Sequence, residues 1–487
     1  MKPTSNTITS QKNKRRHRFL IIGLIILLLQ AILDFTVSVA QVRIFGSNAD
    51  AISTEIQQQL DNSALLQKLN FPKSVKRFYG LNMNQAIWLA ADGNSDPTAS
   101  AIILLDHVEQ YGLQGKKYHP EILHDKMMRE IWQTTRPLSL VQKIEFEILL
   151  TDALISIIND LHYGGFNPFL PSIKIDSGMH TGLRAEVFLN RIKDSDSLMD
   201  SIIRVQPQLE AYQQLQSYVQ ENLNQAVNNS NESAWDEINM ISMNLERLRW
   251  SNINRDNYIL INIPSFELFY HTVDSTYLFK VVIGKKITPT PLLTSDISHL
   301  ETAPDWQIPN KIFIKELLPK AIKNNAFFEN NQMAVYDLKS NFIPINPRTI
   351  AQIKQNSKKF YARQSAGCDN ALGKVVFRFN NSYTIYLHDT PEQSYFSKIK
   401  RTFSHGCIRV EKAELLATLL LKNDGQTERI PVLKKAMDHY TKKRFNFRTN
   451  IPIIVTYLTI TVLDKQLHYH EDIYGLDKLL KEKMFGV

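Results

Sequence analysis

The spacing of the apolar residues changes near Asn257, and this change constrains the fold more than any other feature of the chain. Before it, apolar side chains recur at helical intervals, as over residues 144–158 and 236–250. After it, every second residue is apolar, as over residues 259–263 and 266–270, which is typical of strands. A helical half followed by a half of short strands predicts an α+β chain.

The two halves predict two domains. We expect a mostly helical domain over residues 50–250 and a β-rich domain, a sandwich or open barrel, over residues 256–465. Residues 466–487 then form a C-terminal tail. The strand pattern lapses over residues 312–364, where helical spacing returns. These residues predict a helical insertion, either a lid over an active site or a surface insertion without function.

The N-terminus combines a basic segment, residues 1–18, with an apolar run, residues 19–40. This order is typical of a secretory signal or a signal-anchor. Ser38 and Ala40 offer the small residues that cleavage requires, whereas an uncleaved run would hold the chain in a membrane. The segment is either a signal cleaved near Ala40 or an uncleaved anchor, and in both cases we expect the rest of the chain to be exported.

The net charge of +9 raises the question of nucleic-acid binding. Part of this charge lies in the basic N-terminal segment, and no basic stripe with interleaved aromatic residues occurs elsewhere. Hydrophobic residues make up 43% of the chain and charged residues 22%, as in ordinary globular proteins. We therefore expect no nucleic-acid partner.

The segment Ser404-His405-Gly406-Cys407-Ile408-Arg409 follows a predicted strand that ends at His388. A thiolate is the attacking form of cysteine, and an imidazole can accept the thiol proton and stabilise the resulting charge. Backbone N–H groups around Gly406 and Cys407 would stabilise an oxyanion. The pattern predicts a cysteine acyltransferase in which Cys407 is the nucleophile and His388 the proton donor and acceptor. A packed structural histidine is the alternative for His388.

Metal binding is the competing use of histidine. His468 and His470 alternate in a predicted strand, but no third ligand at a recognisable spacing accompanies them, and no HExxH motif occurs. Glycine-rich phosphate loops are absent from the sequence as well. We expect no metal and no cofactor.

Several segments together resemble the L,D-transpeptidases with a YkuD-type catalytic domain. They are Asn370-Ala371-Leu372-Gly373, His388-Asp389-Thr390, the segment from Ser404 to Arg409, Tyr457-Leu458-Thr459, and the tail from Asp472 to Asp477. The helical half is similar to the scaffold domain that precedes the catalytic domain in the larger Gram-negative members. The resemblance implies that residues 312–364 form a lid.

The resemblance also implies a substrate and a location. Cys407 would attack the carbonyl of meso-diaminopimelate in a donor tetrapeptide stem of peptidoglycan, release D-alanine, and pass the acyl group to an acceptor amine of a second stem. The product is a 3→3 cross-link made in the periplasm, with residues 19–40 either in the inner membrane or removed. Water as the acceptor would make an L,D-carboxypeptidase, and a lipoprotein lysine would make an anchoring enzyme. A non-catalytic wall-binding protein is the third alternative.

Two further residues beside the nucleophile have open roles. His405 either positions the thiolate or is structural, and Ser404 either orients His388 or caps the turn. Arg409 is expected to grip a stem carboxylate with its planar guanidinium. Its alternative is a surface ion pair with Glu411.

The remaining site predictions lie further away in the sequence. Tyr386 matches a position that lies near the substrate in the family, although an aromatic residue in a strand usually packs in the core. Trp306 lies in a segment similar to the Pro-Tyr-Trp-x-x-Pro of the family, with Asp305 in place of the tyrosine. Asn370 is assigned to substrate binding by resemblance. Cys368 is either a loop thiol without a role or the partner of Cys407 in a reversible disulfide that silences the enzyme.

Overall fold

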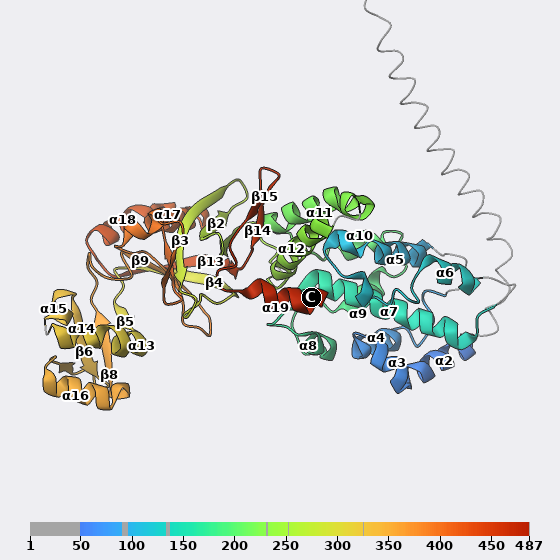
Figure 1. Ribbon diagram of the computed structural model, residues 1–487, viewed down its shortest axis with the longest axis horizontal. Helices are drawn as coiled ribbons and strands as arrows, with labels where there is room; N and C mark the ends of the chain where they lie inside the picture. The colour runs from blue at the N-terminus through green and yellow to red at the C-terminus, as the bar shows by residue number, and fades with distance from the viewer. Residues whose placement is uncertain are drawn as a thin grey trace, which may run out of the picture. The chain divides into compact units, whose positions relative to one another are not determined.

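The computed structural model describes residues 49–89, 96–132, 137–229, 232–251, 253–324 and 326–486 (Figure 1). The predicted basic segment and signal or anchor, residues 1–40, lie outside this part of the chain. None of the described helices is long and apolar enough to cross a membrane. Residue contacts divide the chain into a unit that ends at Gln206 and a unit that starts at Pro207.

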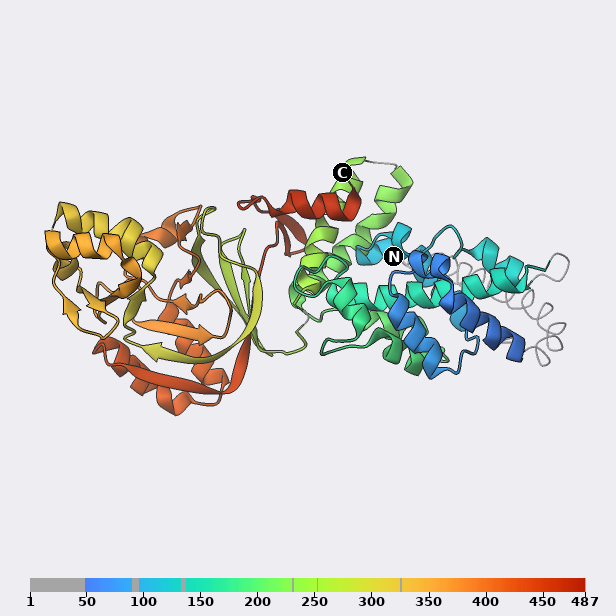
Figure 2. The same ribbon diagram turned by 90° about the horizontal axis from the view of Figure 1, so that it is seen from below.

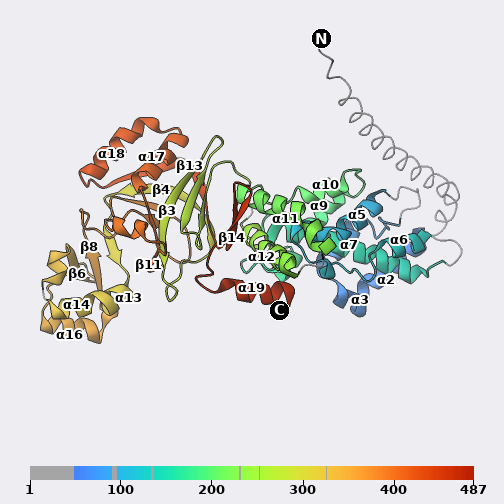
Figure 3. The same ribbon diagram turned by 45° about the horizontal axis from the view of Figure 1, so that its top comes forward.

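The first unit is helical, and its centre is α7 (Leu140–Tyr163). Almost every residue of α7 from Phe146 to Leu161 is buried, so the other helices pack around its whole circumference (Figure 3). A capping box at Ser139 starts the helix: the Ser139 hydroxyl accepts a hydrogen bond from Gln142 N–H, and Gln142 Oε1 accepts one from Ser139 N–H. The helices around α7 are α2 (Ala49–Asp61), α3 (Ser63–Lys68), α4 (Pro72–Leu81), α5 (Asp96–Asp106), α6 (Asp125–Trp132), α8 (Ser172–Ser177), α9 (Ala185–Ile192) and α10 (Leu198–Ile203), with short 3-10 helices at Val108–Tyr111 and Gly115–Lys117.

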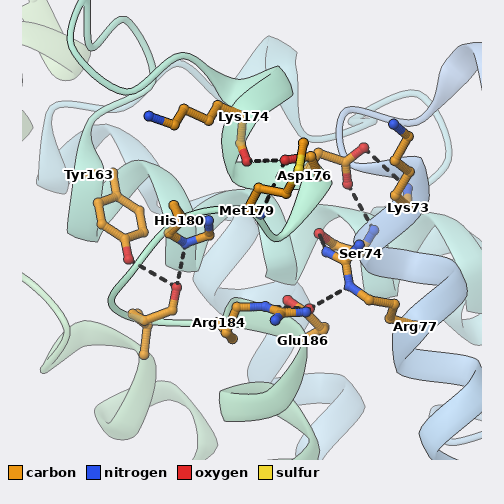
Figure 4. A network of polar contacts seen from close by, with 12 residues as sticks. Lys73, Ser74, Arg77, Tyr163, Lys174, Asp176, Met179, His180, Arg184 and Glu186 are labelled. Atoms are coloured by element: carbon orange, nitrogen blue, oxygen red, sulfur yellow. Dashed lines mark hydrogen bonds and ion pairs between the residues drawn. The ribbon is translucent and has the colours of Figure 1, made fainter.

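Buried carboxylates fix the helices of this unit to one another. Asp176 on α8 accepts hydrogen bonds from the backbone N–H groups of Lys73 and Ser74, 3.2 and 2.8 Å away, at the start of α4 (Figure 4). Glu186 on α9 accepts one from Arg77 on α4, 2.7 Å away. Asp176 therefore satisfies N–H groups that the start of α4 leaves open and acts as a cap, whereas Glu186 forms an ion pair.

The second unit is built on a nine-stranded sheet in the order β11-β3-β12-β10-β9-β4-β13-β1-β2. A further pairing between β2 and β3 closes the sheet into a barrel, where the sequence predicted a sandwich or open barrel (Figure 2). The predicted strands over residues 259–263 and 266–270 are confirmed as β1 (Tyr258–Asn262) and β2 (Glu267–His271), and β3 (Thr276–Gly284) follows them. The others are β4 (Leu293–Thr302), β9 (Val375–Phe379), β10 (Leu387–His388), β11 (Thr402–Ser404), β12 (Ile408–Val410) and β13 (Lys443–Thr456).

Two helices cover part of the barrel, and a cluster of apolar residues fills it. Isoleucine, leucine and valine side chains from the strands make the core together with one face of α17 (Ala413–Asn423). The neighbouring helix α18 (Ile430–Asp438) contacts α17 and β4. Helix α17 packs Leu416, Leu419 and Leu420 on the barrel.

Helices α11 (Glu210–Asn229) and α12 (Glu232–Arg249) belong to the second unit, although the sequence predicted a helical domain as far as residue 250. Leu245 and Leu248 of α12 share a buried cluster with Leu260 of β1 and Ile454 of β13. The hairpin of β14 (Ile460–Leu463) and β15 (Gln466–Tyr469) joins this cluster, and α19 (Leu476–Phe485) contacts α12. The boundary moves to Pro207 because the outer face of the sheet is apolar and needs this cover.

The insertion is a small α/β subdomain with a core of its own, and it begins at Trp306. Its four-stranded sheet has the order β5-β8-β6-β7, so the prediction of a helical insertion is only half right. Buried Phe313, Phe328 and Val335 join the helices to this sheet. The elements are β5 (Trp306–Ile308), α13 (Asn310–Ile312), the π-helix η3 (Phe313–Leu317), α14 (Leu318–Lys323), α15 (Phe327–Asn330), β6 (Met333–Asp337), β7 (Phe342–Ile343), α16 (Pro347–Gln355), a 3-10 helix at Ser357–Lys359 and β8 (Phe360–Gln364).

Candidate active site

A tight turn between β11 and β12 carries Cys407. The buried Ser404 hydroxyl donates a hydrogen bond to the Cys407 carbonyl, 2.6 Å away, and accepts one from the Gly406 N–H at 3.1 Å. Gly406 has φ of 117°, a backbone conformation that residues with a Cβ rarely adopt. Of the two roles predicted for Ser404, the structure shows the cap of the turn.

The pairing of β10 with β12 gathers the candidate catalytic residues on one face of the sheet. Leu387 lies opposite Ile408 and His388 opposite Arg409 in this parallel pair. Side chains two positions apart share a face of a strand. Tyr386 and His388 therefore point to the same side as Cys407 and Arg409, and the rings of Tyr386 and His388 are 5.7 Å apart.

His388 is buried and neutral. Its Nδ1 lies 2.6 Å from the carbonyl oxygen of Asp389, so Nδ1 carries the proton and Nε2 keeps a free lone pair. Burial lowers the pKa of His388 to about 3, with the positive charges of Arg409 and Arg378 as further causes. An imidazole of this kind is uncharged at neutral pH and can accept a proton at Nε2.

Cys407 is half-buried, and its thiol is free. Burial raises the pKa of this thiol, while hydrogen bonds from the backbone and the side chain of Tyr386 oppose the rise. Both groups of the Cys407–His388 pair are therefore uncharged before reaction, in contrast to a thiolate–imidazolium pair. The hydrogen bonds from Tyr386 would favour the thiolate as it forms.

Tyr386 links the nucleophile to the insertion. Its hydroxyl is hydrogen-bonded to Cys407 and to Trp306 of β5, and burial raises its pKa above the ordinary value. The guanidinium of Arg378 lies 4.5 Å from the centre of the Tyr386 ring. Trp306 and Tyr386 are thus brought to the site, although 80 residues separate them in the sequence.

Arg409 places its guanidinium at the same face, where the Tyr395 side chain is hydrogen-bonded to it. Its Nε and Nη1 atoms are buried and have no hydrogen-bond partner among the described residues. The guanidinium lies 5.3 Å from the centre of the Tyr395 ring, which holds it in place. The alternative of an ion pair with Glu411 is not what the structure shows. Unsatisfied donors at a buried cation are costly unless an anion binds them.

Three predicted site residues have other surroundings. The Asn370 side chain is fully buried, donates to the carbonyls of Ser365 and Pro304, and accepts from Leu372 N–H, so it holds a loop and does not face a substrate. His405 lies 2.5 Å from Glu316 of the insertion through Nε2 and is exposed. The Gly406 N–H is occupied by Ser404, so it is not an open oxyanion donor.

Arg378, Tyr395 and Thr290 are site residues that the sequence did not reveal. Arg378 lies on β9 and Tyr395 in a 3-10 helix at Gln393–Ser397, and their side chains meet Tyr386 and Arg409. Thr290 is 116 positions before Gly406 and contacts its carbonyl. A threonine, an arginine and a tyrosine of ordinary composition carry no local signal, because their roles come from strand pairing.

Within the described residues, no three histidine, cysteine, aspartate or glutamate side chains are grouped as a metal site would require. Cys368 is exposed, and neither it nor Cys407 is in a disulfide. The described site contains a thiol, a neutral imidazole and a guanidinium.

Comparisons with known proteins match two parts of the chain. Residues 256–433 match the family model of the L,D-transpeptidase catalytic domain, and residues 73–218 match that of the scaffold domain. A putative L,D-transpeptidase of Haemophilus influenzae is 32% identical over 242 residues, which cover 49% of this chain and 48% of that protein. The match thus spans about half the length of this relative. A solved structure titled "Structure of the Ldtfm-avibactam carbamoyl enzyme" aligns with a TM-score of 0.22 and 12% identity over 42% of this chain and 51% of that one, a similarity too low to carry an argument.

Proposed function

We propose that this protein cross-links peptidoglycan, because residues 256–433 match the family model of the L,D-transpeptidase catalytic domain of the YkuD type and residues 73–218 match that of the scaffold domain. It joins two meso-diaminopimelate residues in a 3→3 cross-link, through a thioester at Cys407, and releases D-alanine. The observation that carries the proposal is the grouping of Cys407, neutral His388 and the partly unpaired guanidinium of Arg409 on one face of the sheet.

Acylation starts with the neutral pair. His388 Nε2 takes the thiol proton while the sulfur bonds to the carbonyl carbon of diaminopimelate, and the carbonyl electrons move onto oxygen. When the carbonyl re-forms, the C–N bond to D-alanine breaks, and the imidazolium gives its proton to the leaving amine. An acceptor amine then attacks the thioester and loses a proton to His388. Cleavage of the C–S bond regenerates the thiol.

Arg409 supplies a binding site for the donor stem. Its Nε and Nη1 atoms are buried and lack hydrogen-bond partners within the described residues, and a guanidinium donates charged hydrogen bonds to a carboxylate. Peptidoglycan stems with diaminopimelate carry such carboxylates beside the reacting carbonyl. Tyr395 fixes the plane of the guanidinium, so little freedom is lost when the carboxylate binds.

The acceptor decides between closely related functions. Water would make the protein an L,D-carboxypeptidase, and a lipoprotein lysine would make it an anchoring transpeptidase. A wall-binding protein without activity is a further alternative, and the intact pair of Cys407 and His388 argues against it.

The deciding experiment incubates the reduced protein, residues 42–487, with disaccharide-tetrapeptides that contain diaminopimelate, and identifies the products by tandem mass spectrometry. We expect dimers joined between two diaminopimelate residues, and no dimers with Cys407→Ala. Tripeptides alone would instead identify a carboxypeptidase. No product from the wild-type protein, under conditions where Cys407 can still be alkylated, would contradict the proposed acyl transfer.

The proposed location is the periplasm, with residues 19–40 as an inner-membrane anchor or as a cleaved signal. Mass measurement of the protein recovered from cell membranes and from the periplasmic fraction tests both. An anchor leaves an intact N-terminus in the membrane fraction, whereas cleavage near Ala40 gives a shortened soluble chain.

A further inference from the structure

The peptide bond between Gly406 and Cys407 has one polar end inside the protein and the other end open. The Gly406 carbonyl accepts a hydrogen bond from the Thr290 hydroxyl, 2.9 Å away, and Thr290 is buried. In a planar trans peptide the carbonyl and the following N–H point in opposite directions. The bond to Thr290 therefore turns the Cys407 N–H away from the protein interior, toward the side where an acyl group would approach Cys407.

This N–H is the open donor of the turn. The Gly406 N–H is bound to Ser404, and Ile408 N–H donates to the Tyr386 carbonyl at 3.1 Å. Among the described residues, none accepts a hydrogen bond from the Cys407 N–H. A carbonyl oxygen that becomes negative beside Cys407 would meet this donor.

Thr290 is itself held from two sides. Its hydroxyl accepts a hydrogen bond from Gly284 N–H at 2.9 Å. The hydroxyl of Tyr474 accepts one from Thr290 N–H at 3.2 Å and donates one to the Gly284 carbonyl at 2.6 Å. A Cβ on Gly284 would lie 2.1 Å from the Thr288 carbonyl oxygen, so only glycine allows the loop after β3 to come this close. The position of Thr290 is therefore fixed before any substrate binds.

We propose that Thr290, held by Tyr474, is a positioning residue that aims the Cys407 N–H at the oxyanion of the acyl-transfer step. Neither residue touches the reacting atoms. Thr290 acts through the Gly406 carbonyl, because a hydrogen bond at this oxygen both fixes the peptide plane and polarises the adjoining N–H into a stronger donor. Tyr474 lies beyond residue 433, where the family match ends, so the C-terminal tail contributes to the site. The inference rests on the proposed acyl transfer and deepens it.

The role can be separated from thiol reactivity, because two reagents attack the same sulfur differently. With iodoacetamide the sulfur displaces iodide at a saturated carbon, and no oxyanion forms. With the carbapenem imipenem the sulfur bonds to the lactam carbonyl, an oxyanion forms, the ring C–N bond breaks, and the nitrogen takes a proton. Only the second reaction uses the Cys407 N–H.

The experiment measures both rates by intact mass on the reduced protein for the wild type, Thr290→Val, Thr290→Ser and Tyr474→Phe. Removing a donor from an oxyanion site costs roughly 100- to 1,000-fold, and we expect Thr290→Val to lose about 10- to 100-fold in acylation because the donor is misaligned and not deleted. Iodoacetamide should react at the wild-type rate. Thr290→Ser keeps the hydroxyl and should be acylated at close to the wild-type rate. Tyr474→Phe should reduce the acylation rate by less than Thr290→Val does.

Three results would overturn the inference. If Thr290→Val lowers the rates of alkylation and acylation equally, Thr290 supports either the fold or the reactivity of the thiol, and a melting curve would show which. Unchanged acylation in Thr290→Val would mean that the peptide plane does not depend on Thr290. If the wild-type protein is alkylated at Cys407 but never acylated, the proposed function fails together with this inference, and that pattern is distinct from the other two.

Discussion

At the scale of single residues, the reacting pair is held uncharged by its surroundings. Burial and the positive charges of Arg409 and Arg378 disfavour an imidazolium at His388, and burial disfavours a thiolate at Cys407. The same cations and the Tyr386 hydrogen bonds favour the thiolate once it forms. The site is therefore arranged for proton transfer during attack.

These shifts predict the pH dependence of Cys407 alkylation. His388 stays neutral above its pKa of about 3, so it contributes no inflection between pH 5 and 8. The thiol pKa is raised, so the iodoacetamide rate should climb with pH through a midpoint above the ordinary thiol value of about 8.5. Rates measured by intact mass from pH 5 to 10 test this. A plateau already present at pH 6 would indicate a thiolate–imidazolium pair and contradict the prediction.

Arg409→Lys tests the guanidinium while keeping the charge beside His388. Lysine is a point charge and cannot give two parallel hydrogen bonds to a carboxylate. A charged hydrogen bond contributes about 1.5–3 kcal/mol, so we expect kcat/KM for the tetrapeptide donor to fall about 10- to 100-fold. Alkylation by iodoacetamide serves as the control and should hardly change. An unaltered kcat/KM would remove Arg409 from substrate binding.

At the scale of elements, side chains join loops to strands, and the loss of unfolding free energy on removing such a side chain depends on how buried it is. Asn370 supports the loop before β9 with three hydrogen bonds in the interior. The contact between Glu316 and His405 joins the insertion to the catalytic turn at the surface. Two elements that meet at a solvated contact can separate at a small cost in free energy. Breaking the hydrogen bonds of a buried amide costs more.

Asn370→Ala and Glu316→Ala form a matched pair for this difference. We expect Asn370→Ala to lower the free energy of unfolding by about 2–3 kcal/mol, because the buried carbonyl of Pro304 and the partly buried carbonyl of Ser365 lose their donor. Glu316→Ala should lower it by less than about 1 kcal/mol, since the pair is exposed. Urea unfolding followed by circular dichroism measures both. A nearly neutral Asn370→Ala with a raised KM would restore Asn370 as a substrate contact.

At the scale of the whole molecule, the catalytic unit includes α11 and α12. Their apolar residues bury Leu260 and Ile454 on the outer face of the barrel. Arg247 of α12 also makes an ion pair with Asp477 of α19 at 2.6 Å, with the arginine side chain almost fully buried. The barrel is therefore incomplete without the two helices, whichever domain the sequence pattern assigns them to.

Two fragments test this boundary. The fragment 207–487 should be soluble, unfold cooperatively, and allow slow alkylation of Cys407 at neutral pH. The fragment 256–487 lacks α11 and α12, exposes the apolar outer face of the sheet and leaves Asp477 without Arg247, so it should aggregate or melt at a much lower temperature. Equal melting temperatures for the two fragments would contradict the division at Pro207.

The sequence by itself determined the class of the fold and singled out Cys407 and His388 as the proposed reacting pair. Apolar spacing reports which faces of a helix or strand are buried, and the segment around Cys407 is local, so both can be recognised along the chain. The helix over 144–158, the strands from 258 to 284 and the place of His388 at a strand end were predicted correctly.

Only the tertiary structure decided which polar groups form hydrogen bonds within the protein and which are left for a substrate. The N–H of Gly406 is occupied by Ser404 and the amide of Asn370 is buried, while Thr290 and Tyr474 reach the catalytic turn from distant segments. Hydrogen-bond partners of this kind depend on strand register and barrel closure, which bring together residues more than 100 positions apart. No local pattern encodes such pairings, because each residue is of an ordinary type in an ordinary neighbourhood.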